Sequence, residues 1–307
     1  MRLLAARAMS DVAAAQCATI VSLADSLHFF TTLRDRGPMT AGDVASACNV
    51  EPQFAHYALT ALAASGYVDS DGTTYSLSDE QRAVFADEDS PLFLAGAFQL
   101  AKGLTTADAQ QVAEGIARSS RVKFPPIVMQ RAAGSLQNVA EIGCGSGGTL
   151  IELALRDPSL RATGIDRDAE AIARARDAAA RAGVSDRIAF IVGDERALPP
   201  SNLILSLEML HECPDPVSIA RAVHAALQPG GRWLVVEPCG GASAGNDTRF
   251  LASLAALHCG PASRFAPNAP GPLALRETYE RIVRDGGFTE FSVEADGPIH
   301  IVIEARR

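Results

Sequence analysis

The feature that most constrains the fold is an apolar run that breaks into glycines, NVAEIGCGSGG, over residues 138–148. Its apolar start predicts a β-strand, and the following residues, 149–156, have the apolar spacing of a helix. Because glycine lacks a Cβ, the backbone of the turn can approach a ligand at the first residues of that helix. The segment therefore predicts a strand, a turn and a helix that together bind a nucleotide-like molecule.

From this turn to the end of the chain, apolar runs alternate with helical patterns. The alternation predicts an α/β fold with a Rossmann-like, mostly parallel sheet of seven strands and helices on both faces. The last two runs are joined only by Asp296-Gly297-Pro298, and so short a connection predicts an antiparallel C-terminal hairpin. The expected strands are 139–142, 162–165, 188–192, 203–207, 233–236, 291–294 and 300–304.

The first part of the chain has a mainly helical pattern. We expect one long helix over 10–34, helices over 40–48 and 51–65, and a hairpin over 67–77. This order is typical of a winged helix, and one interpretation is a DNA-binding module. The helix at 51–65 contains no Lys or Arg, however, and the segment to Glu80 has four arginines against nine acidic residues. We therefore expect residues 1–86 to be a winged-helix-like dimerisation domain of a homodimer.

Residues 87–137 have a helical pattern again, which predicts a linker that also forms a pocket wall, with Pro125-Pro126 interrupting the helix. Arg121 and Lys123 are candidates for an anion contact, and the alternative is a solvated pair. Four large apolar side chains could either wall a substrate pocket or pack the joint between domains: Phe93, Phe98, Phe124 and Met129.

Composition excludes some partners. The 307 residues carry a net charge of −9, which disfavours a nucleic-acid surface or an anionic membrane surface, because such surfaces need clustered Lys and Arg. The six cysteines are scattered without CxxC spacing, as expected for free thiols in a reducing cytoplasm. No uncharged apolar stretch of about 18 residues is present to span a bilayer. We expect a cytoplasmic protein that acts on a small molecule.

The glycine pattern alone leaves the cofactor open. Gly143, Gly145 and Gly148 also satisfy the dinucleotide fingerprint, and Asp166 ends the next strand, where an acid can bind a ribose. Three further features favour a cationic cofactor without phosphates. Glu141 lies inside the first strand, a second acidic pair follows the third strand at Asp194-Glu195, and no basic run is available for phosphates. A Pro-Gly-Gly turn at 229–231 then enters the fifth strand.

These segments resemble the motifs of the class I S-adenosylmethionine-dependent methyltransferases. EIGCGSGG is similar to the first motif of that family, GIDRD to its ribose-binding segment, VGDERALP to its adenine-side motif and LQPGGRWLVVEP to its strand-five motif. The resemblance covers residues 138–307 and implies an S-adenosyl-L-methionine-binding catalytic domain. With the helical front half, the chain resembles the dimeric small-molecule O-methyltransferases of secondary metabolism.

The resemblance also implies roles for individual residues. Glu141 would meet the methionine amino group, Asp166 the ribose hydroxyls and Asp194 the adenine. The glycines would let the cofactor approach the backbone. The residues that directly follow the two aspartates, Arg167 and Glu195, would complete the site. The remaining cofactor-binding candidates are Gly143, Gly145, Gly147, Arg167 and Glu195.

The candidate catalytic residues follow strands four and five. A hydroxyl acceptor needs a base, and His211 has an ordinary pKa near 6.5, which suits proton transfer near neutral pH. The segment LHECPDP resembles the LHDWxDE segment that carries the catalytic histidine of the O-methyltransferases, although its tryptophan and acidic pair are missing. Glu237 would orient or polarise the reacting groups. The alternatives are a structural histidine and a solvated strand end.

Two other functions stay open at this stage. Methyl transfer could go to carbon or nitrogen of a small acid, with or without a metal. The chain could also be a transcriptional regulator that senses a ligand. We expect no metal, because the residues that could converge on one lack the intervals of a known site: His211, Cys213, Cys239, His258 and Cys259.

Overall fold

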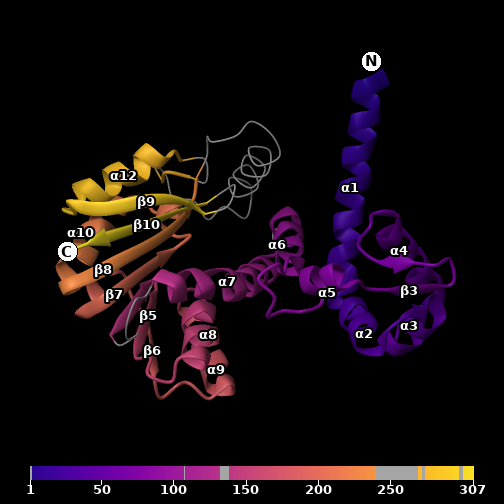
Figure 1. Ribbon diagram of the computed structural model, residues 1–307, viewed down its shortest axis with the longest axis horizontal. Helices are drawn as coiled ribbons and strands as arrows, with labels where there is room; N and C mark the ends of the chain where they lie inside the picture. The colour runs from indigo at the N-terminus through magenta and orange to yellow at the C-terminus, as the bar shows by residue number, and fades with distance from the viewer. Residues whose placement is uncertain (1, 107, 132–137, 240–268, 272–273, 297–299) are drawn as a thin grey trace. The chain divides into compact units, whose positions relative to one another are not determined.

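The computed structural model describes residues 2–106, 108–131, 138–239, 269–271, 274–296 and 300–307. The chain divides into two compact units, Met1–Val122 and Lys123–Arg307 (Figure 1). The first unit is mainly helical, and helix α7 continues from it into the second unit. Its elements are α1 (Arg2–Ser26), α2 (Phe29–Arg36), β1 (Met39–Thr40), α3 (Ala41–Cys48), α4 (Pro52–Ala64), β2 (Asp69–Ser70), β3 (Thr74–Ser76), α5 (Asp79–Phe85), α6 (Ala95–Thr106) and α7 (Ala109–Arg131).

The prediction of one long helix over 10–34 is wrong, because the chain forms two helices there, α1 and α2. The break falls at His28, whose φ of 63° is left-handed, and a right-handed helix cannot continue through such a residue. The histidine carries no sequence signal for this break. Phe29, Phe30 and Leu33 of α2 are buried as a result.

The helix pair and the hairpin of the first unit form as expected. Thr40 caps α3, because its Oγ1 accepts from Asp43 N while its own N donates to Asp43 Oδ2, each at 3.2 Å. Strands β2 and β3 pair antiparallel, and β1 pairs with the other edge of β3. These elements close on a core that includes Val44, Leu59 and Leu62. The winged-helix assignment itself stays a prediction.

The expected interruption at Pro125-Pro126 is also wrong, because α7 runs through both prolines. A proline inside a helix removes a backbone hydrogen bond and costs about 3 kcal/mol. Phe124 and Val128 on either side are fully buried in the core of the second unit. We infer that this burial offsets the cost and keeps the segment helical.

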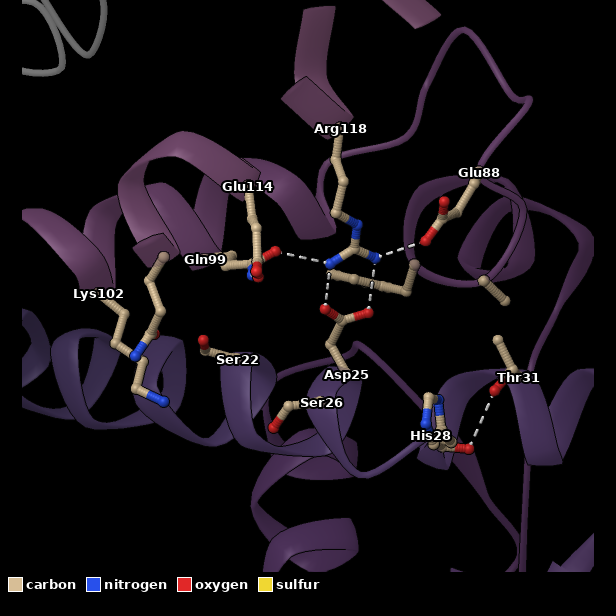
Figure 2. A pocket seen from close by; sticks show the side chains of 13 residues that line it. Ser22, Asp25, Ser26, His28, Thr31, Glu88, Gln99, Lys102, Glu114 and Arg118 are labelled. Carbon is tan, nitrogen blue, oxygen red and sulfur yellow. Dashed lines mark hydrogen bonds and ion pairs between the residues drawn. The ribbon is translucent and has the colours of Figure 1, made fainter. Parts of the chain in front are cut away.

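Arg118 of α7 ties the first unit together. Its guanidinium donates to both carboxylate oxygens of Asp25 in α1, at 2.5 and 3.0 Å, and also to Glu88 and Gln99 at 2.9 Å. Figure 2 shows these side chains converging on one side of a cavity of about 390 Å³. Each of the two terminal guanidinium nitrogens donates to two acceptors, and the cluster therefore links α1, α6 and α7.

The second unit is built on the predicted seven-stranded sheet, whose order is β6-β5-β4-β7-β8-β10-β9. The first five strands of this order are parallel, and β10 runs antiparallel to both β8 and β9, as the short hairpin connection predicts. Its elements are β4 (Val139–Ile142), α8 (Gly148–Arg156), β5 (Ala162–Asp166), α9 (Ala169–Ala182), β6 (Ile188–Val192), η1 (Glu195–Ala197), β7 (Ser201–Leu207), η2 (Leu210–Glu212), α10 (Pro216–Ala226), β8 (Leu227–Pro238), α12 (Arg276–Asp285), β9 (Glu290–Asp296) and β10 (His300–Arg306).

Each face of this sheet is covered by a helical layer (Figure 1). Helices α8 and α9, with the end of α7, pack on one face, and α10 and α12 pack on the other. Alternate residues of a strand serve opposite faces, so in β8 Leu234 points to the first core while Trp233 and Val235 point to the second. The α/β prediction is therefore confirmed, with the carboxyl ends of the parallel strands on one edge of the sheet.

Within the described chain, no single helix has both the length and the apolar character needed to cross a bilayer. The bent pair of helices at 4–26 and 29–36 meets both criteria only when taken together.

Candidate functional site

The glycine turn lies at the carboxyl end of β4, on the edge of the sheet where the parallel strands end. Gly143, Gly145 and Gly147 all have positive φ, between 53° and 76°, which explains why glycines occupy these positions. The turn is fixed from the next strand, because Gly143 N and Cys144 N donate to Ile165 O at 2.8 and 3.1 Å. Its backbone is therefore held in place before any ligand arrives.

The three glycines make room for different neighbours. A Cβ at Gly147 would lie 2.5 Å from the ring of Phe190, and one at Gly143 would lie 2.9 Å from Met209 Cβ. A Cβ at Gly145 would meet no atom within 4 Å, so this glycine faces open space. Gly145 is therefore the position at which a ligand can approach the backbone, whereas Gly143 and Gly147 also serve packing.

Glu141 is the unusual residue of the site. It lies in β4 directly before the turn and is only 3% exposed. Its Oε2 atom is buried and has no hydrogen-bond partner among the described residues. Burial, with a smaller contribution from the nearby Asp166 charge, raises the pKa of the Glu141 carboxyl to about 8. A buried carboxyl without a partner is costly, so its side chain fits a cationic donor that would satisfy it.

Asp166 ends β5 and lies against the same turn. Its Oδ2 accepts from Gly145 N at 2.8 Å, and its Oδ1 accepts from Asp168 N at 2.9 Å. Each carboxylate oxygen can accept more than one hydrogen bond, so the half-buried side chain keeps capacity for hydroxyl donors.

The second acidic corner follows β6. Asp194 caps the short η1 helix and pairs with Arg196 at 2.6 Å, and the hydrogen bonds from Arg196 lower the pKa of the Asp194 carboxyl to about 2. Glu195 pairs with Arg167 at 2.8 Å. The structure therefore gives each acid a basic partner and brings the two predicted residues Arg167 and Glu195 together.

His211 and Glu237 form a buried pair. His211 Nδ1 lies 2.7 Å from Glu237 Oε2, and the Glu237 side chain is fully buried. The same carboxylate accepts from Met209 N and Leu210 N at 3.0 and 2.7 Å, and from His211 N at 3.3 Å. Glu237 is thus the residue that shapes the η2 turn as well as the partner of the histidine ring.

This pairing determines the protonation of the histidine. A carboxylate only accepts, so it favours the proton on Nδ1 and leaves the lone pair on Nε2. Burial lowers the pKa of His211, but the hydrogen bond and charge of Glu237, with smaller contributions from Glu212 and Glu208, outweigh it, so the pKa is raised.

A third cluster joins Lys123, a predicted candidate for an anion contact, to two residues that were not predicted as site residues. Lys123 of α7, Glu208 after β7 and His300 at the start of β10 meet in the second unit. Lys123 Nζ contacts Glu208 Oε1 and lies 2.8 Å from His300 Nε2, which is 2.6 Å from Glu208 Oε1. Lys123 thus contacts Glu208 and His300, while Arg121 pairs with Asp89. The sequence places Glu208 at a strand end, but only the strand order places His300 beside β8.

Among the residues that the structure describes, no group of three or more His, Cys, Asp or Glu side chains could hold a metal ion. His258 and Cys259, two of the five candidates, lie outside the described residues. Cys213 Sγ donates to Met209 O at 3.2 Å, and burial raises the pKa of its thiol to about 12.

Comparisons with known proteins agree with this geometry. Residues 134–264 match the family model described as a methyltransferase domain. The 27-O-demethylrifamycin SV methyltransferase of Amycolatopsis mediterranei is 34% identical over 110 residues, which cover 33% of this chain and 40% of that protein. The aclacinomycin 10-hydroxylase RdmB of Streptomyces purpurascens is 36% identical over 124 residues, which cover 39% of this chain and 33% of that protein. The chain thus spans less than half the length of these curated relatives.

The likeness to solved structures extends over the whole chain. CalO1, a methyltransferase in calicheamicin biosynthesis whose structure is a bound form with S-adenosylhomocysteine (SAH), has a TM-score of 0.70 at 20% identity, with coverage of 99% of this chain and 98% of that one. The mitomycin 7-O-methyltransferase MmcR has a TM-score of 0.68 at 21% identity, with coverage of 100% and 99%. Residues 134–264 are therefore similar to a methyltransferase domain, and the whole chain shares the fold of these solved structures.

Proposed function

We propose that this chain is an S-adenosyl-L-methionine-dependent methyltransferase that acts on a hydroxyl group of a small molecule. The observation that carries the proposal is the orphaned Oε2 of Glu141 beneath the glycine turn. A buried carboxyl in that position suits the ammonium of a methionine moiety. It offers no positive charge to the pyrophosphate of a dinucleotide.

The residues present fit this cofactor. Glu141 would hold the amino group, Gly145 would let the ligand reach the backbone, and Asp166 would accept from the ribose hydroxyls. Asp194 would lie on the adenine side, with Arg167 and Glu195 closing that corner through their ion pair. When bound, S-adenosylmethionine supplies an activated methyl group on its sulfonium. This assignment is supported by the SAH-bound form of CalO1, a structure of the same fold.

His211 would act as the general base. Nε2 carries the lone pair and would take the proton of the acceptor hydroxyl, which makes the oxygen a better nucleophile. Glu237 would hold the ring through Nδ1 and stabilise the imidazolium that forms. It is already fixed by three backbone amides, so the pair needs little rearrangement during the reaction.

A domain that binds S-adenosylmethionine need not transfer a methyl group. One relative with this type of domain, RdmB, carries the name of a hydroxylase. A second candidate function is therefore hydroxylation of a small molecule, with molecular oxygen and a two-electron reductant as co-reactants. Mass spectrometry of the product separates the two, because one reaction adds a methyl group and the other adds an oxygen atom.

The proposal includes a cytoplasmic homodimer. Residues 1–86 would serve dimerisation, 87–137 would link the domains and wall the acceptor pocket, and 138–307 would bind the cofactor. The support is helix α1, whose residues Leu4, Met9 and Val12 are more than half exposed. An isolated helix with exposed apolar side chains is stabilised when another chain covers it.

Cofactor binding provides the first test. Calorimetric titration of the full chain should give binding of SAH and none of NADH. Glu141→Gln keeps the shape but removes the charge, so we expect it to weaken SAH binding by about 10–100-fold, the value of a charge-assisted hydrogen bond. Glu170→Gln makes the same change at an exposed position and should leave the affinity unchanged. Binding of NADH but not SAH would refute the assignment.

The base is tested by the pH dependence of turnover, with a hydroxyl acceptor found by product analysis of phenols, amines and keto acids. His211 loses its proton as pH rises through its raised pKa, so turnover should increase with pH around a midpoint above 6.5. Glu237→Gln removes the charge that raises this pKa and should move the midpoint to lower pH. His211→Ala should lower turnover by about 10²–10⁴-fold.

The matched control for the pH profile is Glu290→Gln, an exposed glutamate at the start of β9, which should not move the midpoint. A loss of only a fewfold in His211→Ala would show that the acceptor needs no base.

The homodimer is tested by sedimentation equilibrium of the full chain. The wild type should sediment as a dimer, and the triple variant Leu4→Ser, Met9→Ser, Val12→Ser should shift toward monomer. Tyr57→Ser removes an equally exposed apolar side chain from α4 and should leave the dimer intact. A wild-type chain that sediments as a monomer would contradict this part of the proposal.

A further inference from the structure

The cluster of Lys123, Glu208 and His300 contacts neither the proposed base nor the proposed cofactor-binding residues through a hydrogen bond given above, although the charge of Glu208 helps to raise the pKa of His211. Its three members come from distant parts of the second unit, the end of α7, the end of β7 and the start of β10. The side chains of Lys123 and Glu208 are each 31% exposed, whereas that of His300 is 8% exposed. The cluster is therefore an open polar site with a buried floor.

The backbone of Glu208 is strained. Its φ of 52° lies in the left-handed region, which costs a glutamate about 1 kcal/mol or more relative to glycine. The turn itself needs only this backbone conformation, with Glu208 N donating to Val236 O at 2.7 Å. A glycine or asparagine would form the turn with less strain, so the glutamate side chain must matter for another reason.

The hydrogen bonds of the cluster are unevenly distributed. Oε1 of Glu208 contacts both Lys123 Nζ and His300 Nε2, while Oε2 has no recorded hydrogen bond within the described ranges. Because His300 Nε2 donates to Glu208, it cannot also accept from Lys123, which therefore has three protons and one acceptor, Glu208 Oε1, in the same ranges. The charge of Lys123 and the hydrogen bond from His300 overcome the effect of burial and lower the pKa of the Glu208 carboxyl. The two basic groups therefore hold an ionised carboxylate and keep donor capacity for another.

The cluster lies next to the catalytic pair along the chain and across the sheet. Glu208 precedes His211 by three residues, and His300 is paired in register with Pro238, which follows Glu237. A small molecule that reaches His211 with one end can therefore extend toward the cluster with the other.

We propose that Lys123 and His300 bind a carboxylate group of the acceptor, and that Glu208 occupies this position until the acceptor arrives. This inference rests on the proposed function, because it names the substrate class of the same site. The Glu208 carboxylate already has the chemistry of the incoming group. Displacement of the Glu208 side chain costs less free energy because the strained backbone of the turn can relax when the side chain leaves. The acceptor is then a small hydroxy acid, with the acid held by the cluster and the hydroxyl presented to His211.

A purely structural role for the cluster makes a different prediction. If the three side chains only hold α7 against the sheet, replacing the lysine and replacing the glutamate should change the affinity for a carboxylate in the same direction. If they bind a carboxylate, the two changes should have opposite effects, because Lys123 attracts the ligand and Glu208 competes with it.

The test uses benzoate and benzamide as probes, titrated by ligand-observed NMR into the full chain saturated with SAH. The wild type should bind benzoate at least about 10-fold more tightly than benzamide, the scale of one charge-assisted contact. Lys123→Gln should abolish this preference. Glu208→Gln should strengthen benzoate binding several-fold and leave benzamide unchanged. Equal affinity for the two probes, undetectable benzoate binding, or weakening by both substitutions would overturn the proposal.

Two controls separate the possible failures. Glu208→Gly fits the left-handed backbone and removes the carboxylate, so it should fold and strengthen benzoate binding as Glu208→Gln does. Calorimetric titration of SAH should give the wild-type affinity in all three variants. Loss of the benzoate preference with normal SAH binding would reject the carboxylate site alone, whereas failure of the wild type to bind SAH would reject the proposed function.

Discussion

Glu141, a buried carboxyl whose Oε2 has no hydrogen-bond partner among the described residues, is the constraint on which the site depends. Its pKa of about 8 lies above its ordinary value of 4.5, so the folded state prefers the protonated form. The contribution of Glu141 to the free energy of unfolding is therefore most favourable below pH 4.5. It is lost as pH rises from 4.5 to 8, because over this range the carboxyl ionises in the unfolded chain but not in the folded chain. The burial of Glu141 is unfavourable, but it provides a pre-formed position for a cation directly beneath the glycine turn.

The acids at this edge of the sheet fall into two groups. Asp166 and Glu237 accept hydrogen bonds from backbone amides with both oxygens, and each holds a loop in shape. Glu141 and Glu208 each keep one oxygen without a recorded hydrogen bond among the described residues, and each carries a cost, burial in one case and backbone strain in the other. The carboxylates that bind backbone amides with both oxygens fix the loops of the site, and we infer that Glu141 and Glu208 respond to ligands.

Much of the fold could be predicted because the signals were local. The strands of the second unit are short apolar runs, and the glycines with positive φ mark the turn after β4. The break at His28 could not be predicted, since its left-handed backbone depends on how the core around Phe29 and Phe30 packs. The helix across Pro125-Pro126 was missed for the same kind of reason, because burial outweighed a local penalty.

The prediction of the site was limited in the same way, because some of its contacts depend on tertiary packing. Glu141, Asp166, His211 and Glu237 follow or end strands, so sequence order places them at one edge of the sheet. Three details need the tertiary structure. Gly147 makes room for Phe190 rather than facing open space, Arg167 pairs with Glu195, and His300 reaches Glu208 only because β10 inserts between β8 and β9.

The most direct test of the central role of Glu141 is the proton balance of cofactor binding. Calorimetric titration of SAH at pH 7, in two buffers with different ionisation enthalpies, measures the protons released. A carboxyl with a pKa of about 8 is mostly protonated at this pH and must ionise to meet an ammonium, so we predict release of about one proton per ligand, absent in Glu141→Gln. A binding enthalpy that does not depend on the buffer would contradict the account.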